Sequence, residues 1–428
     1  MVIAKKIASR PEYLWICFYA SVNSIACLLI LLNHQLLGEA DGVSLLGSTP
    51  VAAIGLFVIF AYIIILGPFF NAFYRFPVAL LPMVQTTTRA GREIGVILFC
   101  LQLGFIVFIL SEGVFIAGST QRSSSLWSQF FVIFSCDILF LFYYAFYRGN
   151  VLYTPNFILL VISSLVRGWI GFILTLVILE SIRMIRSRRL NMRLVLISVI
   201  VLIFAFPLLQ LTKLAIRTSA IGASFDYEIF LGYFLSNFEF GILEEFFADA
   251  FQTVVNRIQI VSQYVVVFQD SDKFNNLYQN GYTLPFWLDG IHGVAYYRVT
   301  EQALPDNLGI QLAKQLDPTS VDLVNWNSNP GLFAWMIINP SLAPAYIIYL
   351  FVILYLTLVF AKRMRSRSPE VRDVIWFSWL AFLLPGWSGP VFLFFHSAVI
   401  FYLIHLFRRL FIAPDLPSYR PSPATTRS

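Results

Sequence analysis

The sequence predicts an all-α fold: a polytopic integral membrane helix bundle of about 10 transmembrane helices with one large extracytoplasmic loop. Three observations lead to this fold class. Hydrophobic residues make up 58% of the chain, charged residues make up 12%, and the mean hydropathy is +0.76. Apolar runs of about 20 residues, the length that crosses a bilayer as a helix, recur along the chain. One long acidic and aromatic-rich segment, residues 213–330, separates two blocks of such runs.

Apolar runs with the length of a membrane span lie near residues 13–37, 51–73, 94–117, 127–147, 194–212, 342–361 and 389–407. Two further regions, 151–182 and 374–388, are ambiguous. The first run is long and no small-residue cleavage site follows it, so we expect a retained anchor in place of a cleaved signal peptide.

The positions of Lys and Arg predict the orientation of the spans, because basic residues concentrate on the cytoplasmic side. Lys5, Lys6 and Arg10 precede the first span, and residues 38–50 contain no Lys or Arg. Basic residues return after the second span. This alternation places the N-terminus in the cytoplasm.

Residues 151–182 decide the topology of the rest. A dense basic cluster follows them at residues 183–193, and another lies at residues 362–372. Both clusters are cytoplasmic if 151–182 crosses the membrane twice, as a tight hairpin that turns at residues 163–168. A single helix would bury Arg167 near the middle of the bilayer, at a cost of about 3 kcal/mol. An additional crossing near residues 76–84 is an alternative that would also place both basic clusters on the cytoplasmic side.

By the same reasoning, the Pro- and Gly-rich turn at residues 385–390 splits 374–407 into a short span and a final span. The predicted organisation has four parts: an N-terminal transmembrane bundle (1–212), the extracytoplasmic loop (213–330), C-terminal transmembrane helices (331–413) and a disordered cytoplasmic tail (414–428). Residues 331–338 are too few to span, which favours an interfacial or re-entrant segment.

Several classes of site are disfavoured by the sequence. All four cysteines lie in apolar spans, so the loop needs no disulfide framework. No Cys or His cluster has zinc-site spacing, and no Gly-rich phosphate loop follows a strand pattern. These absences disfavour an ATP-driven machine. We expect no metal, no cofactor and no nucleic-acid partner. Repeats between the two halves are unconvincing, which disfavours an inverted-repeat transporter.

The predicted loop contains one long helical pattern. Between residues 242 and 268, apolar residues recur every three or four positions, which predicts an amphipathic helix on the membrane surface or across the end of the bundle. Residues 270–330 read as ordered loop with short helices. Their aromatic and amide side chains suit sugar recognition, and they equally suit an interfacial aromatic belt.

These features together resemble a known family. The chain has a hairpin tip with Ser163, Ser164, Arg167 and Gly168, followed by an Arg-rich exit, one span, a large loop and then Asn329-Pro330-Gly331. This arrangement resembles the Wzy-type O-antigen polymerases. The O-antigen ligases are more distant relatives. The resemblance covers residues 150–410.

The resemblance implies an enzyme, a multi-pass glycosyltransferase of the bacterial inner membrane whose large loop lies in the periplasm. Such enzymes polymerise oligosaccharide repeat units during O-antigen or related surface polysaccharide synthesis. They transfer glycan from undecaprenyl pyrophosphate to the non-reducing end of another lipid-linked unit. The implied partners are the undecaprenyl-pyrophosphate-linked oligosaccharide, the lipid bilayer and a chain-length regulator.

That chemistry selects candidate residues. A pyrophosphate leaving group needs fixed positive charge, which Arg supplies with bidentate donors. The catalytic candidates are Arg167, His292 and Arg298, with His292 or a loop carboxylate as the base. The substrate-binding candidates are Arg217, Arg257, Trp287 and Tyr297. Each has a structural alternative: a snorkelling turn residue, a headgroup contact, a simple ion pair or, for His292, a structural hydrogen bond.

Rival functions stay open at this stage. An O-antigen ligase shares the donor and differs only in the acceptor. A polysaccharide transporter or flippase would be expected to place charges inside its spans, where this chain has few, Asp137 and Glu180 being the exceptions. A structural or assembly protein without chemistry is the third alternative.

Overall fold

The computed structural model describes residues 10–45, 47–78, 80–116, 125–169, 171–187, 227–236, 255–317, 327–365 and 369–412, with residue 252 and a few residues between 208 and 219. Most of the predicted span 194–212 lies outside these residues. The candidate Arg217 lies outside them as well. So does most of the predicted helix 242–268.

Regular structure in the first half of the described chain is almost entirely helical. In chain order it comprises α2 (Glu12–Asn33), η1 (Gly38–Ala40), α3 (Ser48–Ile64), η2 (Ile65–Phe69), α4 (Phe70–Tyr74), α5 (Thr88–Glu112), α6 (Leu126–Ile133), α7 (Cys136–Tyr147), α8 (Tyr153–Val166) and α9 (Gly171–Arg186).

The second half begins with short helices and returns to long ones. It comprises α11 (Tyr227–Ser236), α13 (Val261–Gln269), α14 (Ser271–Gln279), η3 (Phe286–Leu288), α15 (Ile291–Val299), α16 (Leu308–Leu316), α17 (Ala334–Ile338), η4 (Pro340–Leu342), α18 (Ala343–Arg363), α19 (Glu370–Ser378), η5 (Trp379–Leu383), α20 (Ser388–Phe407) and η6 (Arg408–Ile412). The two-residue strands β1 (Val84–Gln85) and β2 (Met364–Arg365) pair in parallel.

Six helices of the described chain are long and apolar enough to cross a membrane. They are Glu12–Ala40, Ser48–Tyr74, Thr88–Glu112, Leu126–Tyr147, Pro340–Arg363 and Ser388–Leu410. Several carry large apolar side chains on their outer faces, such as Leu32 (74% exposed) on α2 and Ile348 (63% exposed) on α18. Apolar side chains on all faces are typical of helices in lipid. The chain is therefore a helical membrane protein, and the count of about 10 spans stays a prediction.

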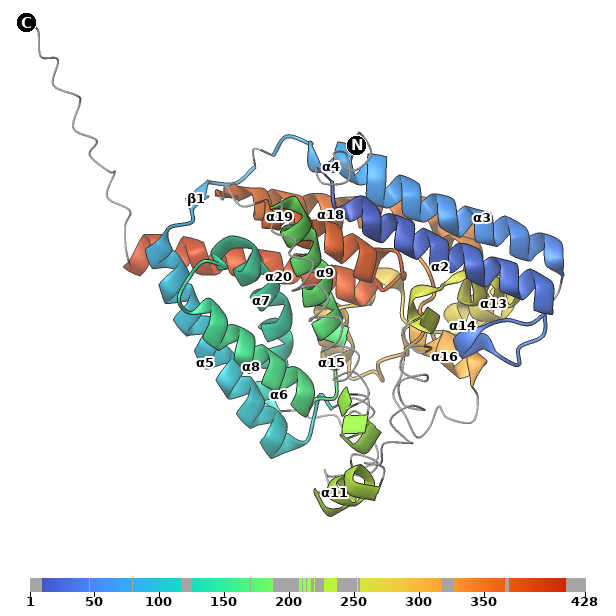
Figure 1. The fold of residues 1–428 in the computed structure, drawn as a ribbon, viewed down its shortest axis with the longest axis horizontal. Helices are drawn as coiled ribbons and strands as arrows, with labels where there is room; N and C mark the ends of the chain where they lie inside the picture. Colours follow the sequence, from blue (N-terminus) through green and yellow to red (C-terminus); the bar gives the residue numbers. More distant parts are fainter. Residues whose placement is uncertain are drawn as a thin grey trace, which may run out of the picture.

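The bundle is organised around α7. Every residue from Ile138 to Tyr147 is buried. In Figure 1, α2 and α3 lie side by side, α5 and α8 lie side by side at the other side of the molecule, and α7, α9 and α19 lie between them.

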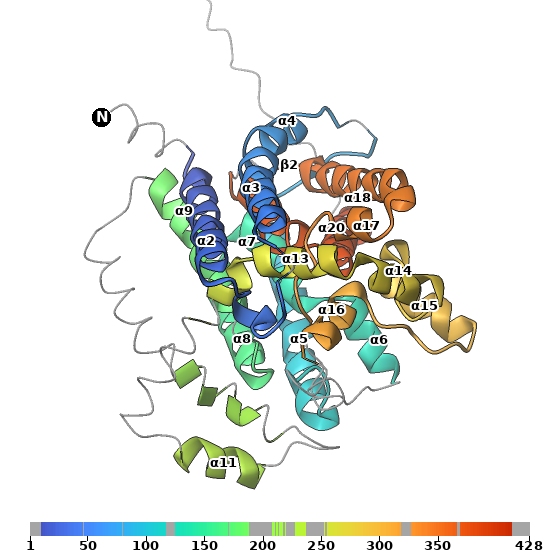
Figure 2. The same ribbon diagram turned by 90° about the vertical axis from the view of Figure 1, so that its right-hand side faces the viewer.

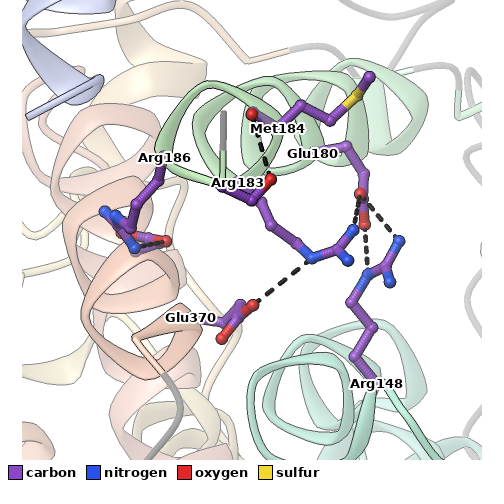
Figure 3. Close-up of polar contacts among 8 residues, drawn as sticks. Arg148, Glu180, Arg183, Met184, Arg186 and Glu370 are labelled. Carbon is purple, nitrogen blue, oxygen red and sulfur yellow. Dashed lines mark hydrogen bonds and ion pairs between the residues drawn. The ribbon is translucent and has the colours of Figure 1, made fainter. Parts of the chain in front are cut away.

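Ion pairs join helix ends at one side of the bundle, which we call the basic end. Arg148, just after α7, binds Glu180 on α9 with a Nε–Oε1 distance of 2.7 Å. Arg183 on α9 also reaches Glu370 at the start of α19, with a Nε–Oε1 distance of 3.5 Å (Figure 3). These contacts bring the start of α8, the end of α9 and the start of α19 together, so α8 and α9 form the predicted hairpin.

The hairpin turn lies close to its predicted position. Helix α8 continues through Val166, and the chain then reverses at Arg167, Gly168 and Trp169. Gly168 has φ +68°, a left-handed conformation that favours glycine. The amides of Gly168 and Trp169 donate to carbonyls of the last turn of α8, at 3.0 and 2.8 Å.

The second predicted turn is also present. Helix α19 continues as the π-helical η5, the chain turns at Leu384–Gly386, and α20 returns to the basic end. There Arg408 forms an ion pair with Glu93 of α5. Residues 374–407 therefore make two passes through the bundle.

The described part of the predicted helix 242–268 requires a correction. Residues 255–258 are helical, Gln259 and Ile260 are not, and α13 then begins. The break has a physical cause in Asn23 of α2, which donates to the Ile258 carbonyl at 3.3 Å and accepts from the Ile260 amide at 2.9 Å. These two hydrogen bonds take the place of backbone hydrogen bonds that a continuous helix would form here.

Helix α13 is also not a surface helix. Its polar residues Ser262 and Gln263 are fully buried, as are the apolar residues beside them. It packs against α3 and α17, and Figure 2 shows it in the centre of the molecule, with α14, α15 and α16 to one side.

Candidate functional site

Two segments that the sequence singled out separately are in contact at the end of the bundle opposite the basic end. The Gly331 amide donates to the Pro385 carbonyl at 2.8 Å, and the Leu332 amide donates to the Leu384 carbonyl at 3.0 Å. The Trp387 indole donates to the Ser328 carbonyl at 3.2 Å. The Asn-Pro-Gly segment is thus bound directly to the turn that begins α20. We call this region, with the side chains described next, the loop-end cluster.

Two glycines allow this close approach. Gly386 has φ +79°, and a Cβ atom there would lie 2.2 Å from the Gly331 carbonyl oxygen. Gly331 has φ +87°, and its Cβ would lie 2.3 Å from the Tyr264 ring. Neither position tolerates a side chain without a shift of the neighbouring backbone or ring.

Arg257 forms one arm of the loop-end cluster. Its Nε lies 3.1 Å from Glu39 Oε1, and its Nη1 donates to the Asn327 carbonyl at 2.8 Å. Glu39 also accepts from Ser328 Oγ at 2.6 Å. The Arg257 side chain is 39% exposed, so its guanidinium is both held in place and accessible to a ligand.

Asp289 and His292 form the other arm. Asp289, between η3 and α15, accepts from the Gly389 amide at 2.8 Å and so caps α20. Burial raises the pKa of the Asp289 carboxyl, although the Gly389 amide, Ser388 and His292 act in the opposite direction. The turn at residues 385–390 therefore contacts both arms.

His292 has a defined tautomer. Its Nε2 bonds the Trp287 carbonyl, which can only accept, so Nε2 carries the proton. Its Nδ1 is buried and has no hydrogen-bond partner among the described residues. The ring centroid lies 4.2 Å from that of Phe392 on α20. The ring is therefore held by a hydrogen bond on one side and by an aromatic contact on the other.

The other candidates on this segment are more exposed. Trp287 in η3 is 37% exposed and packs edge-on against Phe286. Tyr297 is half-buried, and burial raises the pKa of its phenol. Arg298 lies exposed in the last turn of α15, where a cation complements the helix dipole. The structure thus places His292, Trp287, Tyr297 and Arg298 on one continuous segment, and the 385–390 turn connects its start to Arg257.

Arg167 lies at the predicted hairpin turn, and its side chain is buried inside the bundle. Its side chain is 3% exposed, and Nη2 lies 2.8 Å from both carboxylate oxygens of Asp137. The guanidinium also lies over the rings of Phe105 and Trp169, at 5.2 and 4.7 Å. A buried guanidinium needs such a partner. These contacts are with α5, α7 and its own turn, which leaves Arg167 outside the loop-end cluster.

Three residues of the cluster were not among the predicted candidates: Glu39, Asp289 and Trp387. Each carried a weak signal. Glu39 lies in the loop without Lys or Arg, Asp289 is a carboxylate of the predicted loop, and Trp387 lies inside the Pro- and Gly-rich turn. Spacing alone could not connect them.

The arrangement combines three chemical capabilities. Arg257 supplies permanent positive charge, His292 supplies an imidazole, and Trp287 supplies an exposed aromatic face. Among the described residues, no group of three or more His, Cys, Asp or Glu could hold a metal ion. Comparison with protein-family models, curated proteins and solved structures found no match to this chain.

We expect Gly386→Ala to destabilise the protein by disrupting the contact with Gly331. A side chain at positive φ costs about 1–2 kcal/mol, and overlap with a backbone oxygen adds about 1–3 kcal/mol. Gly281→Ala is the matched control, because Gly281 has φ +76° and nothing within 4 Å of its Cβ position. Thermal unfolding in detergent should show the larger loss for Gly386→Ala. Equal losses would mean that the contact contributes nothing.

Asp137→Ala should destabilise the protein strongly, because it leaves the Arg167 charge buried and unpaired, at about 3–5 kcal/mol. The double variant Arg167→Met with Asp137→Leu should recover much of this loss, since apolar replacement of a buried pair is often neutral. Arg89→Ala, in an exposed pair with Glu93, should change stability by about 0.5 kcal/mol or less. Normal unfolding of Asp137→Ala would contradict the pairing.

The raised pKa of Asp289 gives a prediction with a definite sign. The folded protein binds this proton more tightly than the unfolded chain, so the wild type loses stability as the pH rises from the unfolded pKa to the folded one. Asp289→Asn keeps an oxygen that can accept from the Gly389 amide and carries no charge. The stability of the variant relative to wild type should therefore increase through that pH window and stay constant above it. Thermal unfolding from pH 4 to 8 measures this, with exposed Asp272→Asn as the control. A relative stability that falls with pH would refute the assignment.

Proposed function

We propose that this chain is a membrane glycosyltransferase that polymerises lipid-linked oligosaccharide repeat units. Its donor would be a glycan on undecaprenyl pyrophosphate, and its acceptor the non-reducing end of another lipid-linked unit. The observation that carries the proposal is the loop-end cluster, in which the Asn-Pro-Gly segment binds the turn of the final hairpin and holds Arg257 close to the start of α20. The Asn-Pro-Gly segment is also part of the family resemblance.

The location of the cluster supports a substrate with a lipid anchor. It lies where the polar segment meets the ends of α18 and α20, which are long enough to cross a membrane. A glycan at such a junction can remain attached to a lipid in the bilayer while its sugars reach polar side chains. The basic residues gather at the opposite end, which supports an extracytoplasmic position for the cluster.

The proposed reaction uses the side chains as follows. The acceptor hydroxyl oxygen bonds to the anomeric carbon of the donor, and its proton goes to a base, for which His292 or a loop carboxylate serves. The bond between the anomeric carbon and the phosphate oxygen breaks, and the lipid pyrophosphate leaves with the electron pair. Arg257 binds the leaving pyrophosphate by charge-assisted hydrogen bonds. Asp289 holds the start of α20 against the segment that carries His292.

Complementation of a strain that lacks the gene tests this proposal. Without the gene, the surface glycan should carry single repeat units, and the wild-type gene should restore long chains. Arg257→Ala and His292→Gln should each reduce chain extension about a hundredfold at normal protein level. Arg257→Lys keeps the charge without the planar fork and should restore part of the activity. Gel profiles of the extracted glycan report the chain lengths.

Glu39→Gln is the matched control for Arg257. It removes the ion pair with Glu39 and leaves the Arg257 charge and its bond to the Asn327 carbonyl in place. Long chains in Glu39→Gln with single units in Arg257→Ala support a substrate contact. Equal loss in both variants would show that Arg257 acts only in holding the fold. Loss of all surface glycan in the deletion strain would favour a flippase or ligase instead.

A further inference from the structure

A separate apolar groove lies at the basic end of the bundle, between α5 and α20. It has a volume of about 350 Å³ and is lined mainly by Ile94, Ile97, Phe134, Ile400, Leu403 and Phe407. Only Glu93 and Arg408 add charged groups to its lining. This groove is distinct from the loop-end cluster, because α20 starts at the cluster and ends at the groove.

The groove is open on the outer surface of the bundle. Its lining residues Ile97, Leu403 and Phe407 are 39%, 46% and 57% exposed. Both helices are long and apolar enough to cross a membrane, so these side chains face the hydrocarbon core. A groove of this kind is filled by an apolar chain that belongs to the bilayer.

Positive charge lies where the groove reaches the basic end. Glu93 binds Arg408 and also Arg89, the latter with an Oε1–Nε distance of 2.8 Å. Arg409 follows Arg408 and donates to the Met83 carbonyl at 3.1 Å. One carboxylate therefore accompanies three guanidinium groups, and the Arg89 side chain is 70% exposed. Excess positive charge between membrane helices is the pattern that binds anionic headgroups.

We infer that this groove is a binding site for an anionic phospholipid. One acyl chain lies along Ile97 and Leu403, and the headgroup phosphate contacts Arg89 and Arg409. Arg408 alone balances the charge of Glu93, so Arg89 and Arg409 contribute net positive charge. The site lies at the opposite end of α20 from the loop-end cluster, so this lipid is not the donor of the proposed reaction. The inference is independent of that proposal.

Native mass spectrometry of the purified full-length protein, with phosphatidylglycerol and phosphatidylcholine as the probes, tests the site. Wild type should retain phosphatidylglycerol preferentially. Arg409→Gln should weaken its binding about fivefold, the effect of one cation near a membrane surface. Ile97→Trp should fill the groove and weaken binding about tenfold.

Matched variants separate a site from general lipid contact. Leu56→Trp places the same ring on the exposed outer face of α3, and Arg75→Gln removes an exposed charge that follows α4. Neither should change the binding of phosphatidylglycerol. Leu403→Trp fills the same groove from α20 and replaces Ile97→Trp if that variant does not fold. Equal retention of the two lipids by wild type, or equal effects of groove and control variants, would overturn the inference.

Discussion

The requirement that buried charges be paired organises this bundle. Glu12 on α2 and Asp373 on α19 are almost fully buried, and each is bound by arginine. Arg372 reaches Glu12 at 2.6 Å, and Arg186 on α9 reaches Asp373 at 2.5 Å. An unpaired charge in this position would be strongly destabilising, so the helix ends that carry these groups must meet.

Once these ends are joined, the positions of the turns follow. Helices α8 and α9 begin and end at the basic end, so their connection must lie at the other end. The same holds for α19 and α20. The turn at Pro385–Gly386 is thereby brought to the end where residues 327–332 lie, and backbone hydrogen bonds complete the contact. The loop-end cluster depends in this way on ion pairs at the far side of the membrane bundle.

The turns were predictable because they follow from residue types. The basic clusters indicate which connections lie on the cytoplasmic side, and Gly168 and Pro385–Gly386 mark the points where the chain reverses. The contacts of the cluster were not predictable, because most use backbone atoms or join distant residues. Ser328 and Glu39 are 289 positions apart. Arg167 shows the same limit. Its charge was visible in the sequence, but its partner Asp137 was only an acid in another span, and nothing in the spacing of the two residues connected them. In the same way, Asn23 interrupts the predicted helix 242–268 from a distant helix.

The short turn between Pro385 and Pro390 has a larger role than its length suggests. Trp387 holds the Ser328 carbonyl, and two residues later the Gly389 amide holds Asp289. The arm with Arg257 and the arm with His292 are therefore positioned by neighbouring atoms of one turn, which leads directly into a membrane-spanning helix. A site on loops alone would be imprecise, whereas side chains supported by a rigid element keep their relative positions. This explains how a chain with a long polar segment can still hold Arg257 and His292 on supported backbone.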